Sequence, residues 1–281
     1  MTARYRVVGV IAKPHQIVGS YLARAVRFLE GRGVQVRLDR TAAELIGRQG
    51  VPRQEVAVGA DLLLVLGGDG TLLSMACSAV ELGIPLAGFN LGTLGFLTEL
   101  KKDTLEDQLA TIQEGRAEES IRTLLRFEVG DRSFLALNDG VVSKGGIARV
   151  VRLDLEIDGQ HVAEIRGDGL IVSTPTGSTA YSLSAGGPIV HPKVDGMVLT
   201  PICPHALTFR PLVIPGTARV VVTPPAAAAS ECRLTLDGQT ALELDPGERM
   251  VVTRAPQTLT LLTSPVIGYY RLLFEKLNWG G

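Results

Sequence analysis

The sequence predicts an N-terminal domain with a doubly wound parallel sheet and a C-terminal antiparallel domain that is β-sandwich-like. Two observations predict this α/β plus all-β fold class. Up to about residue 118, apolar runs typical of buried strands alternate with segments of helical period, as in parallel sheets. Beyond it, residues 151–157 alternate strictly between apolar and polar, and Asp158-Gly159 marks a hairpin turn. We expect residues 1–118 plus 266–281 to form the first domain and residues 119–265 the second.

The elements of the first domain follow from their apolar spacing. Residues 62–66 are apolar throughout, which is typical of a strand buried on both faces. Residues 16–30 place apolar side chains three and four positions apart, which gives a helix with one apolar stripe. Strands are predicted at 6–12, 34–38, 62–66 and 84–90, and helices at 16–30, 42–48 and 104–114, with another starting near residue 70.

The second domain is predicted to consist mainly of strands. They are expected at 122–129, 134–143, 151–157, 162–173, 207–214, 218–223, 233–236, 241–244 and 249–253. The Pro-Pro-Ala-Ala-Ala-Ala stretch at 224–229 is expected to be an exposed loop. Residues 268–277 are predicted to form a helix that packs back on the first domain, with an apolar face made of Tyr270, Leu273, Phe274 and Leu277.

Composition indicates a compact globular protein with small-molecule partners. Of its 281 residues 46% are apolar and 20% are charged, and the formal net charge is −1, so neither a nucleic-acid surface nor a membrane surface is expected. The apolar N-terminal run ends at Pro14, too early for a signal peptide, and we expect a cytoplasmic location. Cys77, Cys203 and Cys232 form no C-x-x-C pair and are expected to be reduced core thiols.

The first chemical motif is Gly67-Gly68-Asp69-Gly70, which joins the apolar strand to a helix. A helix N-terminus favours anions such as phosphate. A carboxylate placed where phosphates should sit costs electrostatic energy unless it binds a metal, orients a hydroxyl or takes its proton. Asp69 is therefore the first functional candidate. An isolated motif of this kind would be only a tight turn. Neither a Walker loop nor a Rossmann fingerprint is present.

The second motif is the polar segment 166–188, rich in Ser, Thr and Gly. Such residues bury little apolar area, and a long polar loop inside a compact domain is more often functional than idle. Tyr181 could stack on a purine or fill a gap, and stacking is favoured because the neighbouring hydroxyls could hydrogen-bond base and ribose edges.

These motifs, in this order, resemble those of the NAD kinases over nearly the whole chain. The first is shared with diacylglycerol, sphingosine and 6-phosphofructokinases, whereas the Thr-Pro-Thr-Gly-Ser-Thr-Ala-Tyr-Ser segment is highly specific. The matching segments are Gly67-Gly68-Asp69-Gly70-Thr71, Asn90-Leu91-Gly92-Thr93-Leu94-Gly95-Phe96, Leu137-Asn138-Asp139, residues 174–182 and Asp237-Gly238-Gln239.

The resemblance implies transfer of the γ-phosphoryl of ATP to the adenosine 2′-hydroxyl of NAD, giving NADP and ADP. It implies that the first domain binds nucleotide, that the second binds NAD, and that Asp69 accepts the proton. A divalent metal, Mg²⁺, and a homo-oligomer (dimer or tetramer) built through the β domain are also implied. The implied ligand-binding residues are Gly67, Gly68, Asp69 and Gly70 for phosphates, Asn138 and Asp139 for adenosine, Arg166 and Asp168 for NAD, Thr179, Ala180, Tyr181, Ser182, Leu183 and Ser184 around adenine, and Gln239.

Some alternatives stay open. Gln160 repeats the tripeptide of Gln239 but precedes the Tyr181 segment, so Gln239 is the expected ligand contact. Ser74 stands where many members of the family have a basic residue, which leaves the phosphate donor open. The alternative functions are a lipid or sphingoid kinase that shares the glycine loop, and a non-catalytic NAD-binding sensor.

Overall fold

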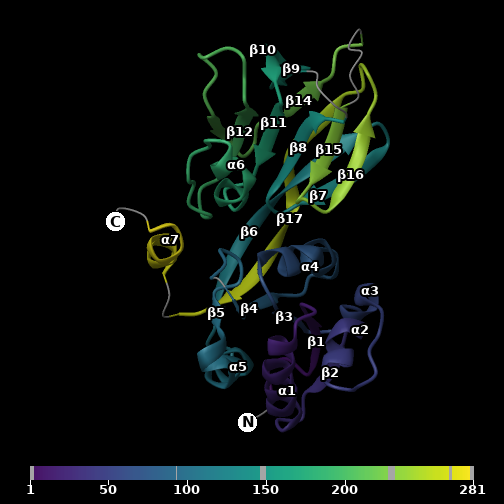
Figure 1. Cartoon of the computed structure of the whole chain (residues 1–281), viewed down its shortest axis with the longest axis vertical. Coiled ribbons are helices and arrows are strands. Elements are labelled where there is room, and N and C mark those ends of the chain that lie inside the picture. Colours follow the sequence, from purple (N-terminus) through teal and green to yellow (C-terminus); the bar gives the residue numbers. More distant parts are fainter. Residues whose placement is uncertain (1–2, 93, 146–149, 227–231, 266–267, 279–281) are drawn as a thin grey trace. The chain divides into compact units, whose positions relative to one another are not determined.

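The computed structural model describes residues 3–92, 94–145, 150–226, 232–265 and 268–278. Its chain divides into two compact units, one made of Met1–Ile121 with Leu259–Gly281 and the other of Arg122–Thr258 (Figure 1). The first unit is α/β and the second is antiparallel β, so the predicted fold class is confirmed. Thr93 and residues 227–229 of the expected loop lie outside the described residues.

A parallel sheet forms the centre of the first unit. Its strands run in the order β4-β3-β1-β2, and all neighbours are parallel. The end of β17 pairs with β4, through Leu261 and Leu86, and β5 also pairs with β4. The bounds are β1 (Val7–Ala12), β2 (Gln35–Leu38), β3 (Leu62–Leu66), β4 (Leu86–Asn90), β5 (Leu100–Lys101) and β17 (Met250–Thr263).

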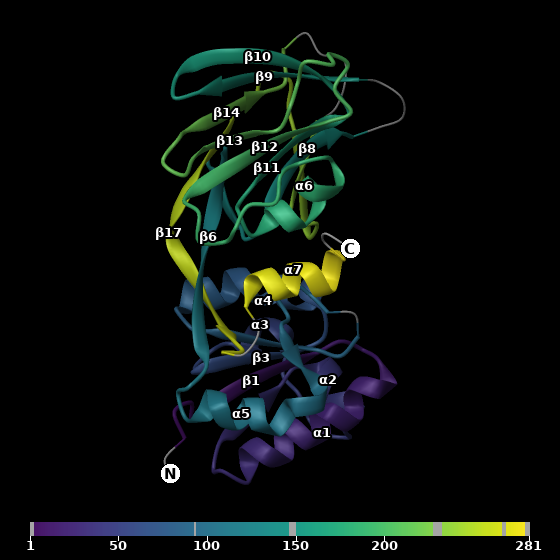
Figure 2. The ribbon, with the colours of Figure 1, turned by 90° about the vertical axis from the view of Figure 1, so that its left-hand side faces the viewer.

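Helices cover both faces of this sheet, as a doubly wound fold requires. Figure 2 shows α1 and α5 on one side and α4 on the other. The apolar stripe of α1 packs with one face of β1 and β3 in a single core, as its period predicted. The helices are α1 (Gln16–Glu30), α2 (Arg40–Leu45), α3 (Arg53–Val56), α4 (Asp69–Leu82), the 3₁₀ helix η1 (Lys102–Thr104), α5 (Leu105–Gln113) and α7 (Tyr269–Leu277).

Two antiparallel sheets pack face to face in the second unit. One has the order β13-β12-β11-β8-β15-β16, and the other is built from β10, β9, β14, β17, β6 and β7. Side chains from both sheets share one apolar core, which makes the unit a sandwich. The strands are β6 (Glu118–Val129), β7 (Arg132–Ala136), β8 (Asp139–Lys144), β9 (Val151–Ile157), β10 (Gln160–Gly167), β11 (Gly169–Ser173), β12 (Gly196–Ile202), β13 (Leu212–Pro215), β14 (Val220–Thr223), β15 (Cys232–Leu236) and β16 (Thr240–Leu244), with the short helices η2 (Gly177–Thr179) and α6 (Tyr181–Ser184).

Several predicted elements have different bounds. The strand expected at 134–143 is broken at Leu137 and Asn138, whose N–H groups bond to the Asp237 carboxylate instead of a neighbouring strand. The strand expected at 162–173 is interrupted at Asp168. The strand expected at 207–214 shortens to β13, and β12, α3 and most of β17 were not predicted. Alternation of apolar residues does not reveal a break imposed by a side chain distant in sequence.

The C-terminal helix belongs to the first unit, and its predicted apolar face is wrong at two of its four positions. Leu272 and Leu273 are buried, whereas Tyr270 and Phe274 are exposed. The three cysteines, none of which is in a disulfide, differ in burial. Cys232 is buried, Cys77 half-buried and Cys203 exposed, so Cys203 is not the core thiol that was expected. No helix in the described ranges is both long and apolar enough to cross a membrane.

Candidate active site

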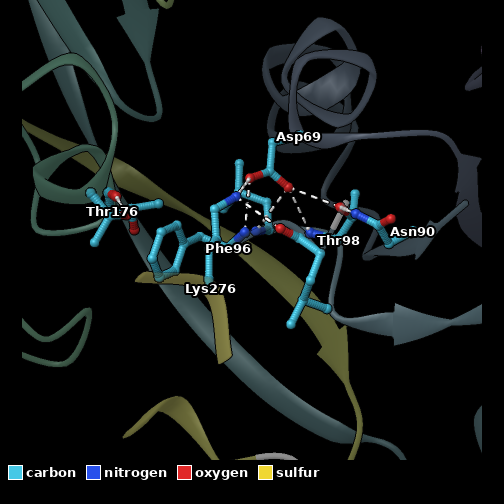
Figure 3. A network of polar contacts seen from close by, with 9 residues as sticks. Asp69, Asn90, Phe96, Thr98, Thr176 and Lys276 are labelled. Atoms are coloured by element: carbon cyan, nitrogen blue, oxygen red, sulfur yellow. Dashed lines mark hydrogen bonds and ion pairs between the residues drawn. The ribbon is translucent and has the colours of Figure 1, made fainter. Parts of the chain in front are cut away.

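Asp69 is the first residue of α4 and its carboxylate is fixed by the loop that follows β4 (Figure 3). One oxygen, Oδ2, accepts the N–H of Phe96 at 2.8 Å. The other, Oδ1, accepts the N–H groups of Leu97 and Thr98 at 3.1 and 3.0 Å and the hydroxyl of Thr98 at 2.9 Å. The side chain is 27% exposed, so it is accessible to a ligand while its orientation is set.

Glycine is needed at position 95 for this arrangement. A Cβ on Gly95 would lie 2.0 Å from Asp69 Oδ1 and 2.3 Å from the Thr98 hydroxyl, far inside van der Waals contact. The loop can therefore wrap around the carboxylate only if residue 95 has no side chain. The family-like segment that ends at Gly95 and Phe96 thus holds the Asp69 carboxylate directly.

Gly68 and Gly70 have a different reason to be glycine. A Cβ at either position would meet nothing within 4 Å, and neither residue has a positive φ. Neither packing nor backbone conformation therefore requires glycine there, and the space beside the backbone is open. Gly68 is the N-cap of α4 and provides no side-chain cap, so the partial positive charge of the helix N-terminus faces that space. This geometry suits an anion such as phosphate.

Two lysines lie near this glycine loop. Lys276 of α7 places its Nζ 3.9 Å from Asp69 Oδ2 and donates a hydrogen bond to the Leu94 carbonyl at 2.9 Å (Figure 3). Lys13 follows β1, and its backbone N–H bonds to Leu66 at the same edge of the sheet. Ser74 cannot add a charge, and its hydroxyl bonds back to the Thr71 carbonyl inside α4.

A pocket of about 410 Å³ lies in the second unit. It brings together four of the residues predicted to bind NAD: Asn138 and Asp139 at the start of β8, and Ala180 and Tyr181 of the polar segment. Tyr181 is 47% exposed, so its ring is available for stacking. The remaining lining residues are Val141, Ser143, Thr235, Asp237 and Gly238.

Asp237 holds the backbone of this pocket in place. It lies in the turn between β15 and β16 with a left-handed φ of 50°. Its carboxylate accepts the N–H groups of Leu137, Asn138 and Asp139 at 2.8, 2.7 and 3.1 Å, and its own N–H bonds to the Asp139 carbonyl at 2.9 Å. The turn and the Asn138–Asp139 segment are therefore one hydrogen-bonded unit.

The electrostatics of the pocket depend on two neighbouring carboxyl groups. Burial, and next the Asp237 carboxylate, raise the pKa of Asp139 to about 7. Burial also raises the pKa of Asp237, although the three backbone N–H groups that it accepts act in the opposite direction. Near neutral pH the Asp139 carboxyl can therefore carry a proton and donate a hydrogen bond, which an ordinary aspartate cannot do.

The hydroxyls of the polar segment have a structural role that the sequence did not reveal. Thr174, Ser178 and Ser182 are fully buried. Their hydroxyls bond to the Leu137 carbonyl, the Pro175 carbonyl and the Thr200 hydroxyl at 2.6, 2.6 and 2.8 Å. Each of these three hydroxyls therefore helps to hold the shape of the polar segment from inside the protein. Thr179 likewise bonds to the Thr176 carbonyl at 3.2 Å.

Other predicted site residues do not line this pocket in the described part of the chain. Asp168 pairs with Lys144 at 3.3 Å, and Arg166 pairs with Glu164. Asp168 precedes Gly169, at the opposite end of β11 from Ser173, which pairs with Asp139. Leu183 and Ser184 of α6 are also outside the lining.

The two Asp-Gly-Gln tripeptides occupy different surroundings. Gln239 is exposed and directly follows Asp237 and Gly238, which line the pocket. Gln160 begins β10. In the turn before it, the Asp158 carboxylate accepts the N–H of Arg219 at 2.8 Å. Only the turn that contains Asp237 lies beside Asn138.

Sequence reasoning missed Asp237, Gly95 and Lys276. The Asp237-Gly238 pair belongs to a segment that resembles the family, but only Gln239 of that segment was expected to contact a ligand. Gly95 was visible as part of the Asn90–Phe96 segment, but the sequence does not show that it lies against the Asp69 carboxylate. No local signal marks Lys276, because a helical pattern does not indicate which charge meets a distant loop.

Comparisons with known proteins identify the family to which the chain is similar. Family models for the ATP-NAD kinase N-terminal domain and the ATP-NAD kinase C-terminal domain match residues 8–117 and 137–264. The NAD kinase of Aromatoleum aromaticum is 42% identical, with 99% of this chain and 96% of the relative covered. The NAD kinase of Thiobacillus denitrificans is 40% identical, with 100% and 99% covered.

Solved structures give the same result. The yeast NADH kinase complexed with NADH has a TM-score of 0.88 and 28% identity, covering 98% of this chain and 88% of that one. An NAD kinase from Archaeoglobus fulgidus in complex with ATP has a TM-score of 0.78 and 26% identity, covering 98% and 100%. With both domain models matched in order and relatives near 40% identity over the full length, this chain belongs to the ATP-NAD kinase family.

Proposed function

We propose that this protein is an NAD kinase, which transfers the γ-phosphoryl of ATP to the adenosine 2′-hydroxyl of NAD and thereby supplies NADP. The observation that carries the proposal is the fixed, accessible carboxylate of Asp69 beside open glycine backbone at a helix N-terminus. The family to which the chain belongs, and relatives solved with NADH and with ATP, support both substrates.

Asp69 is proposed as the group that orients the hydroxyl and accepts its proton. A carboxylate offers about four lone-pair sites, two on each oxygen. Oδ1 already accepts three hydrogen bonds, whereas Oδ2 accepts one from a described residue, the N–H of Phe96. Oδ2 is therefore the proposed proton acceptor. Phosphoryl transfer has a loose transition state, so positioning and late proton removal are the main tasks of this side chain.

The phosphate chain is proposed to lie beside Gly67, Gly68 and Gly70. The uncapped start of α4 supports this placement, because its partial positive charge stabilises the negative phosphates. Mg²⁺ is proposed to enter as part of the substrate, bound to ATP. The described residues contain no group of three or more His, Cys, Asp or Glu side chains placed to hold a metal, and Mg²⁺ is commonly held through substrate phosphates.

The adenosine of NAD is proposed to bind in the pocket of the second unit. Asn138 offers an amide, Asp139 a carboxyl with a raised pKa, and Tyr181 an exposed ring for stacking. Ala180 completes the contact surface of the polar segment. Arg166, Asp168 and Gln239, together with Thr179 and residues 182–184, remain predicted NAD contacts on the strength of the family resemblance.

One assay separates this function from its alternatives. Purified protein is incubated with NAD, ATP and Mg²⁺, and NADP and ADP are measured. An NAD kinase forms both in equal amounts. A lipid or sphingoid kinase forms ADP only when a lipid substrate is added, and an NAD-binding sensor forms neither while still binding NAD in calorimetry. Absence of NADP with intact, folded protein would reject the proposal.

The protein is further proposed to act in the cytoplasm as a homo-oligomer, a dimer or a tetramer. Strand β13 supports an interface through the second unit, because it is the edge strand of its sheet and exposes Leu212 and Val213. Light scattering that finds only a 29.9 kDa species at working concentration would contradict the oligomer. Fractionation of the source cells tests the location.

A further inference from the structure

We infer that Lys276, on the C-terminal helix α7, is a phosphate-binding residue that contacts the terminal phosphates of the donor beside Asp69. The inference rests on the proposed function and adds a substrate contact from a helix that carries none of the sequence motifs. It concerns the first unit alone, since α7, α4 and the loop after β4 all belong to it.

The buried face of α7 directs Lys276 to the site. Lys276 follows Leu272 by four positions and Leu273 by three, so the three side chains lie on one side of the helix. Both leucines are buried in the first unit, and the lysine therefore points to the same side. Its Nζ lies 3.9 Å from Asp69 Oδ2 and 4.8 Å from the centre of the Phe96 ring (Figure 3).

The ammonium of Lys276 has unused hydrogen-bonding capacity. Of its three N–H donors, one bonds to the Leu94 carbonyl at 2.9 Å, and 3.9 Å to Asp69 is too long for a second hydrogen bond. No other hydrogen bond joins it to the described residues. Two donors therefore remain for an anion, and the side chain is 27% exposed, as Asp69 is.

The other charged groups of α7 are already paired with one another. Glu275 bonds to Lys101 of β5 at 3.3 Å and to Arg271 of α7 at 2.9 Å. The negative charge of Glu275 is therefore paired with these two cations and not with Lys276. Lys276 is thus the charge of α7 that reaches the reacting carboxylate. A cation is needed there, because the γ-phosphate and Asp69 are both negative and repel each other as they approach.

A purely structural role makes a different prediction. If Lys276 only ties α7 to Leu94, its loss should lower thermal stability and affect all ligands alike. If it binds phosphate, its loss should weaken the binding of ATP far more than the binding of AMP or NAD. The Lys276→Met variant separates these outcomes, because it keeps an unbranched apolar stem as long as the carbon stem of lysine while removing the ammonium and its charge.

Calorimetry with Mg²⁺ measures the binding of AMP and of a β,γ-imido analogue of ATP, which takes the place of ATP. Steady-state kinetics measure KM for ATP and KM for NAD. Loss of a charge-assisted hydrogen bond predicts an analogue Kd and a KM for ATP raised about 10-fold to 100-fold in Lys276→Met. Affinity for AMP and KM for NAD should change less than about 3-fold, and Lys276→Arg should recover most of the ATP affinity. The matched control is Arg271→Met, which removes the same charge from the same helix at a mostly exposed side chain.

An ATP affinity in Lys276→Met within 2-fold of wild type would overturn the inference, and so would equal weakening of ATP and AMP or the same effect in Arg271→Met. Lys276→Gln replaces Lys276→Met if the latter does not fold. Failure of the proposed function is distinguishable, because wild-type protein would then form no NADP, whereas the calorimetry still reports whether binding of the phosphate chain depends on Lys276.

Discussion

The Asp237 carboxylate accepts the backbone N–H of Asp139 at 3.1 Å, while the Asp139 carbonyl accepts the N–H of Asp237 at 2.9 Å. This reciprocal pair joins a tight turn to the first residue of β8 and places two carboxyl groups together in a buried setting. Buried carboxyl groups are costly unless hydrogen bonds or protonation compensate for the lost hydration. Here the hydrogen bonds to Asp237 oppose the rise that burial causes in its pKa, whereas burial and the Asp237 carboxylate raise the pKa of Asp139 to about 7.

Replacing Asp237 should loosen the NAD pocket. Asp237→Ala leaves three backbone N–H groups without their acceptor, so we expect the free energy of unfolding to fall by about 2–4 kcal/mol and NAD affinity to drop. Urea denaturation and calorimetry measure both. Asp158→Ala is the matched control, because Asp158 lies in a similar Asp-Gly turn with φ 51° and bonds one N–H, that of Arg219. Equal losses in the two variants would contradict the role of Asp237.

The raised pKa of Asp139 predicts an unusual pH dependence of stability. Because its pKa is about 7 in the folded protein and 3.8 ordinarily, the folded state binds more protons than the unfolded state between these values. The contribution of Asp139 to the stability of the folded state is therefore fully present below about pH 4 and is lost as the pH rises toward 7. Burial is the main cause and Asp237 the next.

Asp139→Asn tests this dependence, since asparagine has similar size and no charge. In the wild type we expect the free energy of unfolding to fall between pH 5 and pH 8 by an amount on the order of 1–4 kcal/mol because of Asp139. In Asp139→Asn this fall should be absent. Urea denaturation at several pH values measures it. Parallel pH profiles for wild type and variant would show that Asp139 is not the group responsible.

The Asp69→Asn variant tests the proposed proton acceptor. Removal of the basic oxygen should lower kcat by roughly 10²-fold to 10⁴-fold. The structure adds a cost, because an amide NH₂ cannot accept a hydrogen bond and would leave the N–H of either Phe96 or the Leu97–Thr98 pair without its partner. We therefore expect a loss of about 1–3 kcal/mol in stability as well. Steady-state NADP formation, NAD calorimetry and thermal melts are compared, and near-normal turnover would remove Asp69 from the mechanism.

Much of the fold was predictable because it depends on local patterns. An uninterrupted apolar run such as β3, or the three- and four-residue spacing of α1, contains the information that determines its own burial. The glycine loop with Asp69 was equally visible, since its placement between strand and helix is a property of adjacent residues.

The rest depends on contacts between residues distant in sequence. Asp237 is 99 positions from Asn138, yet its carboxylate ends the strand that alternation extended through residue 138. Ser178 and Ser182 were polar residues typical of a binding loop, but Val190 and Thr200 provide their partners inside the protein. In α7, Leu273 is buried as expected but Tyr270 and Phe274 are not, because a short helix with several apolar residues can pack in more than one rotation.

Gly95→Ala tests whether the fixed orientation of Asp69 matters for activity. The added Cβ would lie 2.0 Å from Asp69 Oδ1, so either the carboxylate or the loop must move by more than an ångström. Since misplacement of about 1 Å at a reacting group can cost about 10²-fold in rate, we expect kcat to fall by roughly that factor while the binding of NAD changes little. Gly92→Ala is the matched control, because it lies in the same loop and a Cβ there would meet nothing within 4 Å. Steady-state kinetics of both variants should therefore differ by about two orders of magnitude, with Gly92→Ala close to wild type. Equal activities in the two variants would mean that the hydrogen bonds from Phe96, Leu97 and Thr98 do not set the catalytic geometry of Asp69.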